Sequence, residues 1–226
     1  MAVMTRITIA AIFLLGLSHA ASTQSFDCAK AQTRVEKMIC AEPALRELDE
    51  HLGRYYAAGR TEVGDAASCL QTNQTHWLRS TRNVCQNATC LKNAYLNRLA
   101  ELDGLQPGAT AIRNITLPRV PVLMWVIPAA ADNVAAPNKA NARPLELTGV
   151  VVEEIENGGD GFMLRTSNGT KVPLMLLMFY EDRTRDRLTV LAKDTGARFR
   201  ARGFAASDSR RTYFEPSRCT FIHRLP

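Results

Sequence analysis

Few side chains in this chain of 226 residues could carry catalysis. The sequence has no Gly-x-Ser-x-Gly, His-Glu-x-x-His or glycine-rich phosphate-binding motif, which mark serine hydrolases, zinc peptidases and nucleotide-binding enzymes. Past the N-terminal segment there are three histidines, His51, His76 and His223, and they are far apart along the chain. We therefore expect a protein that is not an enzyme.

Acidic residues offer the remaining route to chemistry, because a glycosidase works with two carboxylates that face each other across a cleft. Asp27, Glu36 and Asp49 could be arranged in this way, which would make a hydrolase. We favour a structural explanation, because partly buried charges persist when they are paired. The predicted structural ion cluster consists of charged residues on or beside the apolar stripes of four expected helices: Glu36, Asp49, Arg82 and Arg98.

Cysteines are the second reactive group, and there are six of them: Cys28, Cys40, Cys69, Cys85, Cys90 and Cys219. Their spacing contains no Cys-x-x-Cys, and no histidine pair lies near them, so the pattern does not fit a zinc site. An even number of cysteines is typical of disulfides in an oxidising compartment. We expect structural disulfides, no metal and no cofactor.

The N-terminal residues are typical of an export signal. Arg6 is followed by an apolar run over 7–17 and then by Ser18-His19-Ala20, which has the form of a cleavage site. The run is shorter than a membrane span, and no lipoprotein cleavage motif precedes the first cysteine. We expect a signal peptide over 1–20, cleavage near Ala20, no membrane span in the mature chain, and a periplasmic or secreted location.

The net charge of +6 is spread along the chain. Residues 21–104 carry ten Lys/Arg and ten Asp/Glu, so the excess of basic residues past the signal lies in 105–226. Nucleic-acid binding requires basic residues that are gathered into a patch or stripe. We therefore expect no nucleic-acid partner.

The region 33–102 has helical periodicity. Thr33 and Glu36 have the spacing of a capping box, in which both side chains bind free amides of the first helical turn. Pro43 suits the first turn of the next helix, and leucines and a tyrosine recur at three- and four-residue intervals over 45–55. We expect a small antiparallel bundle of helices over about 33–40, from 43 to a turn marked by Gly59 and Gly64, over about 65–85, and over about 90–102.

An ordered set of short motifs runs through this region: Phe26-Asp27-Cys28, Glu36-Lys37-Met38-Ile39-Cys40, Leu45 with Leu48-Asp49, Gln74 with Trp77, Arg82-Asn83-Val84-Cys85, and Cys90-Leu91 with Tyr95 and Arg98. Their order resembles the N-terminal domain family of the lysozyme inhibitor LprI, over about residues 26–102 or a third of the chain. The resemblance implies a small helical domain with disulfides, in which Gln74, Trp77 and Tyr95 are family-motif residues. It also implies that the protein protects the cell wall by binding a muramidase.

The resemblance contains four of the six cysteines, and two disulfides are expected among them, with the pairing left open: Cys28, Cys40, Cys85 and Cys90. In a helical hairpin the end of the third helix lies beside the start of the second, which brings residues 85 and 90 towards residue 40. Once these four are paired, Cys69 and Cys219 are left over. We hypothesise that these two form a bridge between two domains, and two buried free thiols are the alternative.

Gln74 and Trp77 are of residue types that recognise partners. Both lie on the inward stripe of their helix, however, where a tryptophan is more often part of the core. A binding surface would then lie on exposed connections, because these carry function on a rigid frame. The candidate loops are 57–64 and 86–89.

The composition changes after residue 104. Residues 105–143 are rich in proline and alanine and are expected to form a linker. Its apolar island over 122–127 lies between Pro121 and Pro128 and cannot be a membrane helix. We favour a short strand that docks on a neighbouring domain, and an exposed segment that binds a partner is the alternative.

Residues 144–226 alternate with a period of two between turn signals. We expect strands over 145–155, 162–166, 171–177, 197–205 and 213–225, with a helix over 181–191. Three strands, a helix and two strands follow the order of an OB-fold barrel. The predicted fold is therefore α+β with two domains: a small disulfide-bonded helical bundle over 21–104 and a small antiparallel OB-like β-barrel over 144–226.

Two functions are compatible with these predictions. The first is an exported inhibitor that binds a lysozyme or another muramidase and occludes its substrate cleft. The second is a periplasmic binding or scaffold protein that recognises another envelope protein or a glycan through the barrel.

Overall fold

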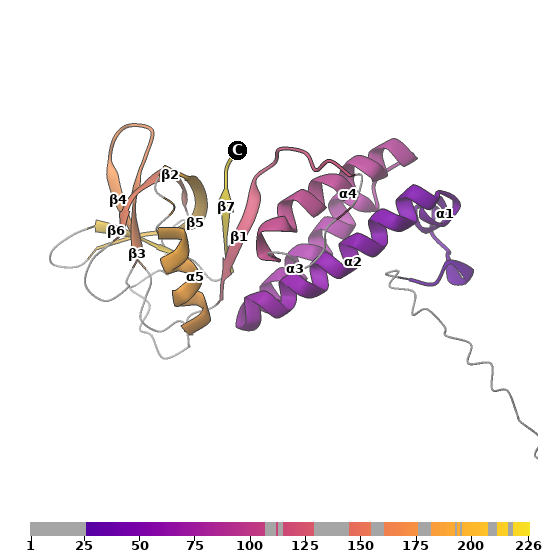
Figure 1. Ribbon diagram of the computed structural model, residues 1–226, viewed down its shortest axis with the longest axis horizontal. Helices are drawn as coiled ribbons and strands as arrows, with labels where there is room; N and C mark the ends of the chain where they lie inside the picture. The colour runs from indigo at the N-terminus through magenta and orange to yellow at the C-terminus, as the bar shows by residue number, and fades with distance from the viewer. Residues whose placement is uncertain are drawn as a thin grey trace, which may run out of the picture.

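The computed structural model describes residues 26–106, 112, 115–128, 145–154, 161–175, 182–192, 194, 196–207, 212–216 and 219–226. The predicted signal peptide lies outside these residues. The described part is α+β, with helices in the N-terminal part and antiparallel strand pairs in the C-terminal part. In Figure 1 the helices α1 to α4 form one end of the molecule, strands β2 to β6 form the other, and β1 and β7 lie between them.

The N-terminal part consists of short and long helices in succession: η1 (Cys28–Lys30), α1 (Arg34–Ala41), α2 (Pro43–Val63), η2 (Gly64–Ala66), α3 (Ala67–Trp77), the π-helical η3 (Leu78–Arg82), α4 (Ala88–Leu102) and η4 (Asp103–Leu105). Thr33 and Glu36 form the predicted capping box of α1, and Pro43 occupies the first turn of α2. Gly64 ends α2 with a φ of 51°, a conformation that favours glycine. No helix in the described ranges has the length and apolar character needed to cross a membrane.

Two predictions about these helices are wrong. Gly59 does not mark a turn: it is buried within α2, where a Cβ would lie 3.5 Å from side-chain atoms of Leu70 and Leu105. The third helix, expected over about 65–85, ends at Trp77 and continues as one π-helical turn to Arg82, so Val84 lies beyond the helix. Its side chain is 54% exposed.

The C-terminal part contains strands and one helix: β1 (Val122–Ile127), β2 (Leu145–Glu154), β3 (Gly161–Arg165), β4 (Lys171–Met175), α5 (Asp182–Ala192), β5 (Arg198–Ser207), β6 (Thr212–Pro216) and β7 (Thr220–Arg224). The last predicted strand is therefore two strands, β6 and β7. Within the described residues the sheet has the order β1-β7-β5-β2-β3-β4-β6, and β5 also pairs with β6. All pairs are antiparallel except β4 with β6, which are parallel, with Leu174 opposite Phe214. The OB-like barrel stays a prediction.

Strand β1 lies inside the segment that was predicted as a linker. It pairs with β7, and the side chains of Trp125, Val126 and Ile127 are fully buried. Gly104, in η4, lies so close to β1 that a Cβ there would be 2.6 Å from the carbonyl oxygen of Leu123. The apolar island is thus a strand docked on its neighbours, as favoured from the sequence, while the domain boundaries stay predictions.

Covalent and polar contacts hold the helical part against the strands. A disulfide joins Cys69 in α3 to Cys219 beside β7, as hypothesised from the sequence. Arg187 of α5 donates to the carbonyl oxygen of Gly104 at 2.8 Å. Arg183, also in α5, donates at 2.8 Å to the carbonyl oxygen of Thr61 near the end of α2. Buried side chains of both parts belong to one hydrophobic cluster.

Candidate functional site

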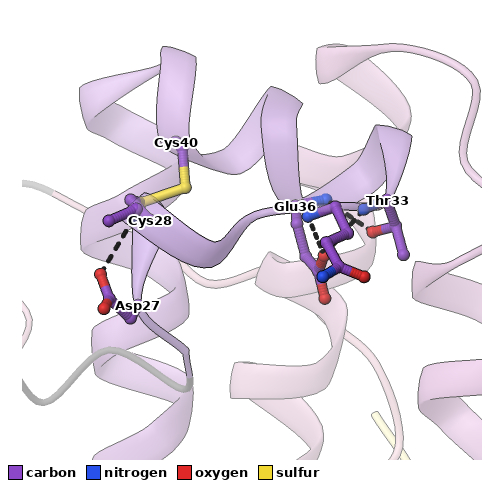
Figure 2. Close-up of a disulfide and its surroundings, with 7 residues drawn as sticks. Asp27, Cys28, Thr33, Glu36 and Cys40 are labelled. Carbon is purple, nitrogen blue, oxygen red and sulfur yellow. Dashed lines mark hydrogen bonds between the residues drawn. A yellow bond between two sulfur atoms is a disulfide. The ribbon is translucent and has the colours of Figure 1, made fainter.

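The four cysteines of the N-terminal resemblance form two local disulfides. Cys28 pairs with Cys40, which ties η1 to the last turns of α1 (Figure 2). Cys85 pairs with Cys90, which closes the turn between η3 and α4. The predicted approach of Cys85 and Cys90 to Cys40 therefore does not lead to a bond between them, and each disulfide stiffens one connection of the bundle.

The closed turn over 83–90, which we call the tip, combines exposure with an ordered backbone. Val84 is exposed, and the Gln86 amide donates to its carbonyl oxygen at 3.0 Å. Asn87 caps α4 by accepting from the amide of Cys90 at 2.9 Å. Three different constraints, namely the disulfide, the cap and the Gln86 bond, thus fix a segment of a few residues.

The N-terminus of α1 lies beside the tip. Arg34 donates from Nη2 to the carbonyl oxygen of Cys85 at 3.2 Å. A hollow of about 240 Å³ is lined by Thr33, Arg34, Val35 and Asn83. The predicted loop 86–89 is thus part of a larger exposed surface that includes this hollow.

The other predicted binding loop, 57–64, is not a loop. Residues 57–63 are the last turns of α2, and only Gly64 departs from it. The carbonyl oxygens of Thr61 and Glu62 accept hydrogen bonds from Arg183 of α5. This segment is therefore a contact between α2 and the C-terminal helix α5.

The family-motif residues Gln74, Trp77 and Tyr95 lie in the interior of the helical part, with exposures of 8%, 8% and 0%. The rings of Trp77 and Tyr95 meet edge to face with 5.8 Å between their centroids. The Tyr95 hydroxyl donates to Asp49 Oδ1 at 2.8 Å. Burial, followed by the Asp49 carboxylate, raises the pKa of Tyr95. These residues therefore build the core from which the tip projects.

The predicted four-residue ion cluster is wrong as a single cluster. Arg82 lies 3.8 Å from the buried carboxylate of Asp49. Arg98 belongs to a separate network, in which it donates to Glu101 at 2.7 Å and to Gln74 at 3.0 Å. The prediction of partners for buried charges holds, but the partners of Arg98 are two amides, Gln74 and Asn73, and a glutamate one helical turn away.

The carboxylate of Glu36 lies at the start of α1, where backbone amides are its main partners and Arg82 adds an electrostatic attraction. It accepts from the amides of Thr33 and Gln32 at 2.8 and 2.9 Å (Figure 2). These backbone hydrogen bonds lower the pKa of Glu36. Asp27 is engaged in a similar way, since it accepts from the amide of Ala29 at 2.9 Å. The carboxylates considered for a glycosidase are thus each held by neighbouring structure.

A pocket that sequence reasoning missed lies between α3, α4 and the strands. It has a volume of about 270 Å³, and its lining includes Trp77, Asn97, Arg200 and His223. At its wall, Glu101 accepts from Arg98 and lies 3.3 Å from Nε2 of His223. We call it the junction pocket. The residues that line it are distant in sequence, so only the alternation of arginines over 198–202 could have pointed to it.

No cluster of three or more His, Cys, Asp or Glu suited to a metal ion occurs in the ranges that the structure describes. The side chains gathered at the tip and in the junction pocket include amides, arginines, threonines, a valine, a tryptophan, a histidine and the carboxylate of Glu101. Such groups bind partners through hydrogen bonds, charge and apolar contact.

No protein-family model matches the chain. Over 102 residues it is 32% identical to the protein named Lipoprotein LprI of Mycobacterium bovis, and equally to that of Mycobacterium tuberculosis. The match covers 43% of this chain and 50% of each relative, so the chain spans about half the length of the curated relatives it matches. The chain is thus similar to the LprI lipoproteins over part of its length.

Proposed function

We propose that this chain is an exported cell-envelope protein that inhibits a lysozyme by binding to it and occluding its substrate cleft. The similarity to Lipoprotein LprI supports this proposal, as does the order of the N-terminal motifs. The protein acts as a binder and not as an enzyme. Its location is periplasmic or secreted, after cleavage near Ala20.

The observation that carries the proposal is the tip. Val84 is held outward beside the disulfide between Cys85 and Cys90. An apolar side chain that is already ordered binds with little loss of conformational entropy. A rigid projection of this kind suits insertion into a cleft.

The polarity of the tip suits a glycosidase in particular. The cleft of a glycosidase contains two carboxylates and groups that bind sugar hydroxyls. The tip offers Asn83, Gln86 and Thr89, which are exposed and uncharged, and the exposed cation Arg34 lies beside them. Amides and hydroxyls can replace the hydrogen bonds of a sugar, and a guanidinium can pair with a carboxylate.

In this proposal the remainder of the chain supports the tip. The helical domain covers 21–104, the linker 105–143 and the β domain 144–226. The pairings of β2 with β3 and β5, of β3 with β4, and of β6 with β4 and β5 support an OB-like barrel.

The test is the turbidity of a cell-wall suspension during lysis by lysozymes of several types. The protein should slow lysis by at least one of them at micromolar concentration. Val84→Glu should weaken inhibition by about 30-fold, because a central apolar anchor contributes about 2 kcal/mol or more to binding. The matched control is Val190→Glu, since Val190 of α5 is 58% exposed, and it should leave inhibition unchanged.

Three results would contradict the proposal. Absence of inhibition of every lysozyme type rejects the function. Equal effects of the two valine substitutions reject the tip as the binding surface. Lysis by the protein alone would mean that it is a hydrolase.

A further inference from the structure

The outward face of β5 carries three arginines. Arg198, Arg200 and Arg202 alternate with the buried residues Phe199 and Ala201. Because side chains two residues apart in a strand point to the same side, about 7 Å from each other, the three guanidinium groups form a line. The sequence predicted a thin spread of basic charge, whereas the strand gathers it.

Neighbouring strands extend this line in a second direction. Arg198 pairs with Val150 of β2, Val150 pairs with Arg165 of β3, and Arg165 pairs with Lys171 of β4. Directly paired residues share a face, so the row adds two exposed cations. We call the five cations the basic face: Arg165, Lys171, Arg198, Arg200 and Arg202.

The cations of the basic face differ in their partners, because Lys171 and Arg202 each interact with other groups. Glu146 of β2 pairs in register with Arg202, at one end of the line. For the side chains of Arg198 and Arg200, no hydrogen-bond or ion-pair partner is found among the residues that the structure describes. The middle of the basic face therefore has the positive charge to attract an anion.

The line of arginines leads into the junction pocket. Arg200 pairs with His223 of β7, and both line the pocket together with Trp77 and Asn97. The carboxylate of Glu101 is already engaged by Arg98 and His223, so it does not neutralise Arg200. The pocket thus combines a cation without a described partner, an aromatic edge and hydrogen-bonding groups.

We infer that the basic face and the junction pocket together bind an acidic polysaccharide, a polymer of sugars that carry carboxylate groups. Guanidinium groups bind carboxylates through paired hydrogen bonds. The pocket can receive one sugar ring, with the edge of Trp77 in its wall and Asn97 at the sugar hydroxyls.

Two other polyanions fit the observations less well. Single-stranded nucleic acid is held by several aromatic side chains on which successive bases stack, whereas the residues named for this site include one aromatic side chain, Trp77, which is 8% exposed. A membrane surface cannot reach a pocket whose tryptophan is 8% exposed. An acidic polysaccharide can bind to the cations of the basic face and also place a sugar ring in the junction pocket.

The experiment measures binding of the full exported chain to polygalacturonate by calorimetry at low and at physiological salt. Dextran serves as the neutral polysaccharide, and polyphosphate and single-stranded DNA serve as other polyanions. The chain should bind polygalacturonate more tightly than the other three, and binding should weaken as salt increases. Arg200→Gln should weaken it at least tenfold, whereas Arg79→Gln, which removes an exposed charge from η3, should not change it.

Four results would overturn the inference: no binding at low salt, equal binding of dextran, tighter binding of polyphosphate or DNA, or equal effects of Arg200→Gln and Arg79→Gln. If Arg200→Gln fails to fold by circular dichroism, Asn97→Asp replaces it. Asn97 is exposed on α4 and lines the pocket. A carboxylate at this position should repel polygalacturonate and weaken its binding tenfold or more. Arg200→Gln should leave lysozyme inhibition unchanged, so the two functions can fail independently.

Discussion

Loss of the bond between Cys69 and Cys219 should destabilise the protein more than loss of either other disulfide. The three bonds have sequence separations of 150, 12 and 5 residues. A crosslink lowers the entropy of the unfolded chain by an amount that grows with the logarithm of loop length. The chain-entropy relation gives about 5 kcal/mol for the long loop, about 3 kcal/mol for Cys28–Cys40 and about 2 kcal/mol for Cys85–Cys90.

The assay is guanidinium unfolding followed by circular dichroism. The test variant carries Cys69→Ala and Cys219→Ala, and the matched control carries Cys85→Ala and Cys90→Ala. The test variant should lose about 3 kcal/mol more than the control, or more than a hundredfold in the unfolding equilibrium. Lysozyme inhibition should follow the opposite order, because the control removes the constraint on the tip and the test variant leaves it intact.

Two results would refute this reasoning. If the control is destabilised as much as the test variant, loop length does not determine the contribution of these bonds. If peptide mapping without reductant finds Cys69 and Cys219 as free thiols, the bond between the helical part and the strands does not form.

Two further predictions concern the packing at η4 and the ionisation of Glu101. Gly104→Ala should lower the free energy of unfolding by about 1–3 kcal/mol, because its Cβ would lie 2.6 Å from the carbonyl oxygen of Leu123. Gly59→Ala, whose Cβ would meet ordinary contacts at 3.5 Å within α2, should raise it by up to about 1 kcal/mol, and effects of the same sign would contradict both expectations. Burial opposes ionisation of Glu101, but hydrogen bonds from His223 and Arg98 outweigh this effect and lower the pKa of Glu101 from 4.5. The ionised carboxylate therefore stabilises the folded protein above about pH 4.5, and this stabilisation is lost as the pH falls. Glu101→Gln should therefore reduce the loss of stability between pH 4.5 and 3 in urea unfolding, and an unchanged loss would contradict this assignment.

Local signals in the sequence predicted the starts of helices better than their ends. The capping box of Thr33 and Glu36 and the proline at position 43 act within one turn, so their effect does not depend on the rest of the fold. Gly59 was wrongly predicted to mark a turn, because a glycine at this position serves tertiary packing: the side chains of Leu70 and Leu105 pack against it. The sequence alone does not distinguish a glycine that ends a helix from a glycine that lets another side chain pack closely against the helix.

The ion-cluster prediction failed at Arg98. Glu36 accepts from the amides of Thr33 and Gln32, and Arg82 also attracts it. Arg98 instead donates to Glu101, Gln74 and Asn73. Helical periodicity indicates that a charged side chain points into the core, but it does not indicate which side chain of another turn or helix will pair with it.

The basic face illustrates why charge counted along a chain differs from charge in space. Residues 198–202 hold three arginines in five positions, yet their distance from each other depends on the element that they form. A helix would spread side chains at this spacing around its axis, about 200° apart at each step of two residues, whereas a strand sets them on one side. Strand register then decides whether Arg165 and Lys171 join them, and a shift of one residue would move both to the opposite face. The candidate site on the strands therefore depends on pairings between β2, β3, β4 and β5 that hydrophobic patterning alone does not specify.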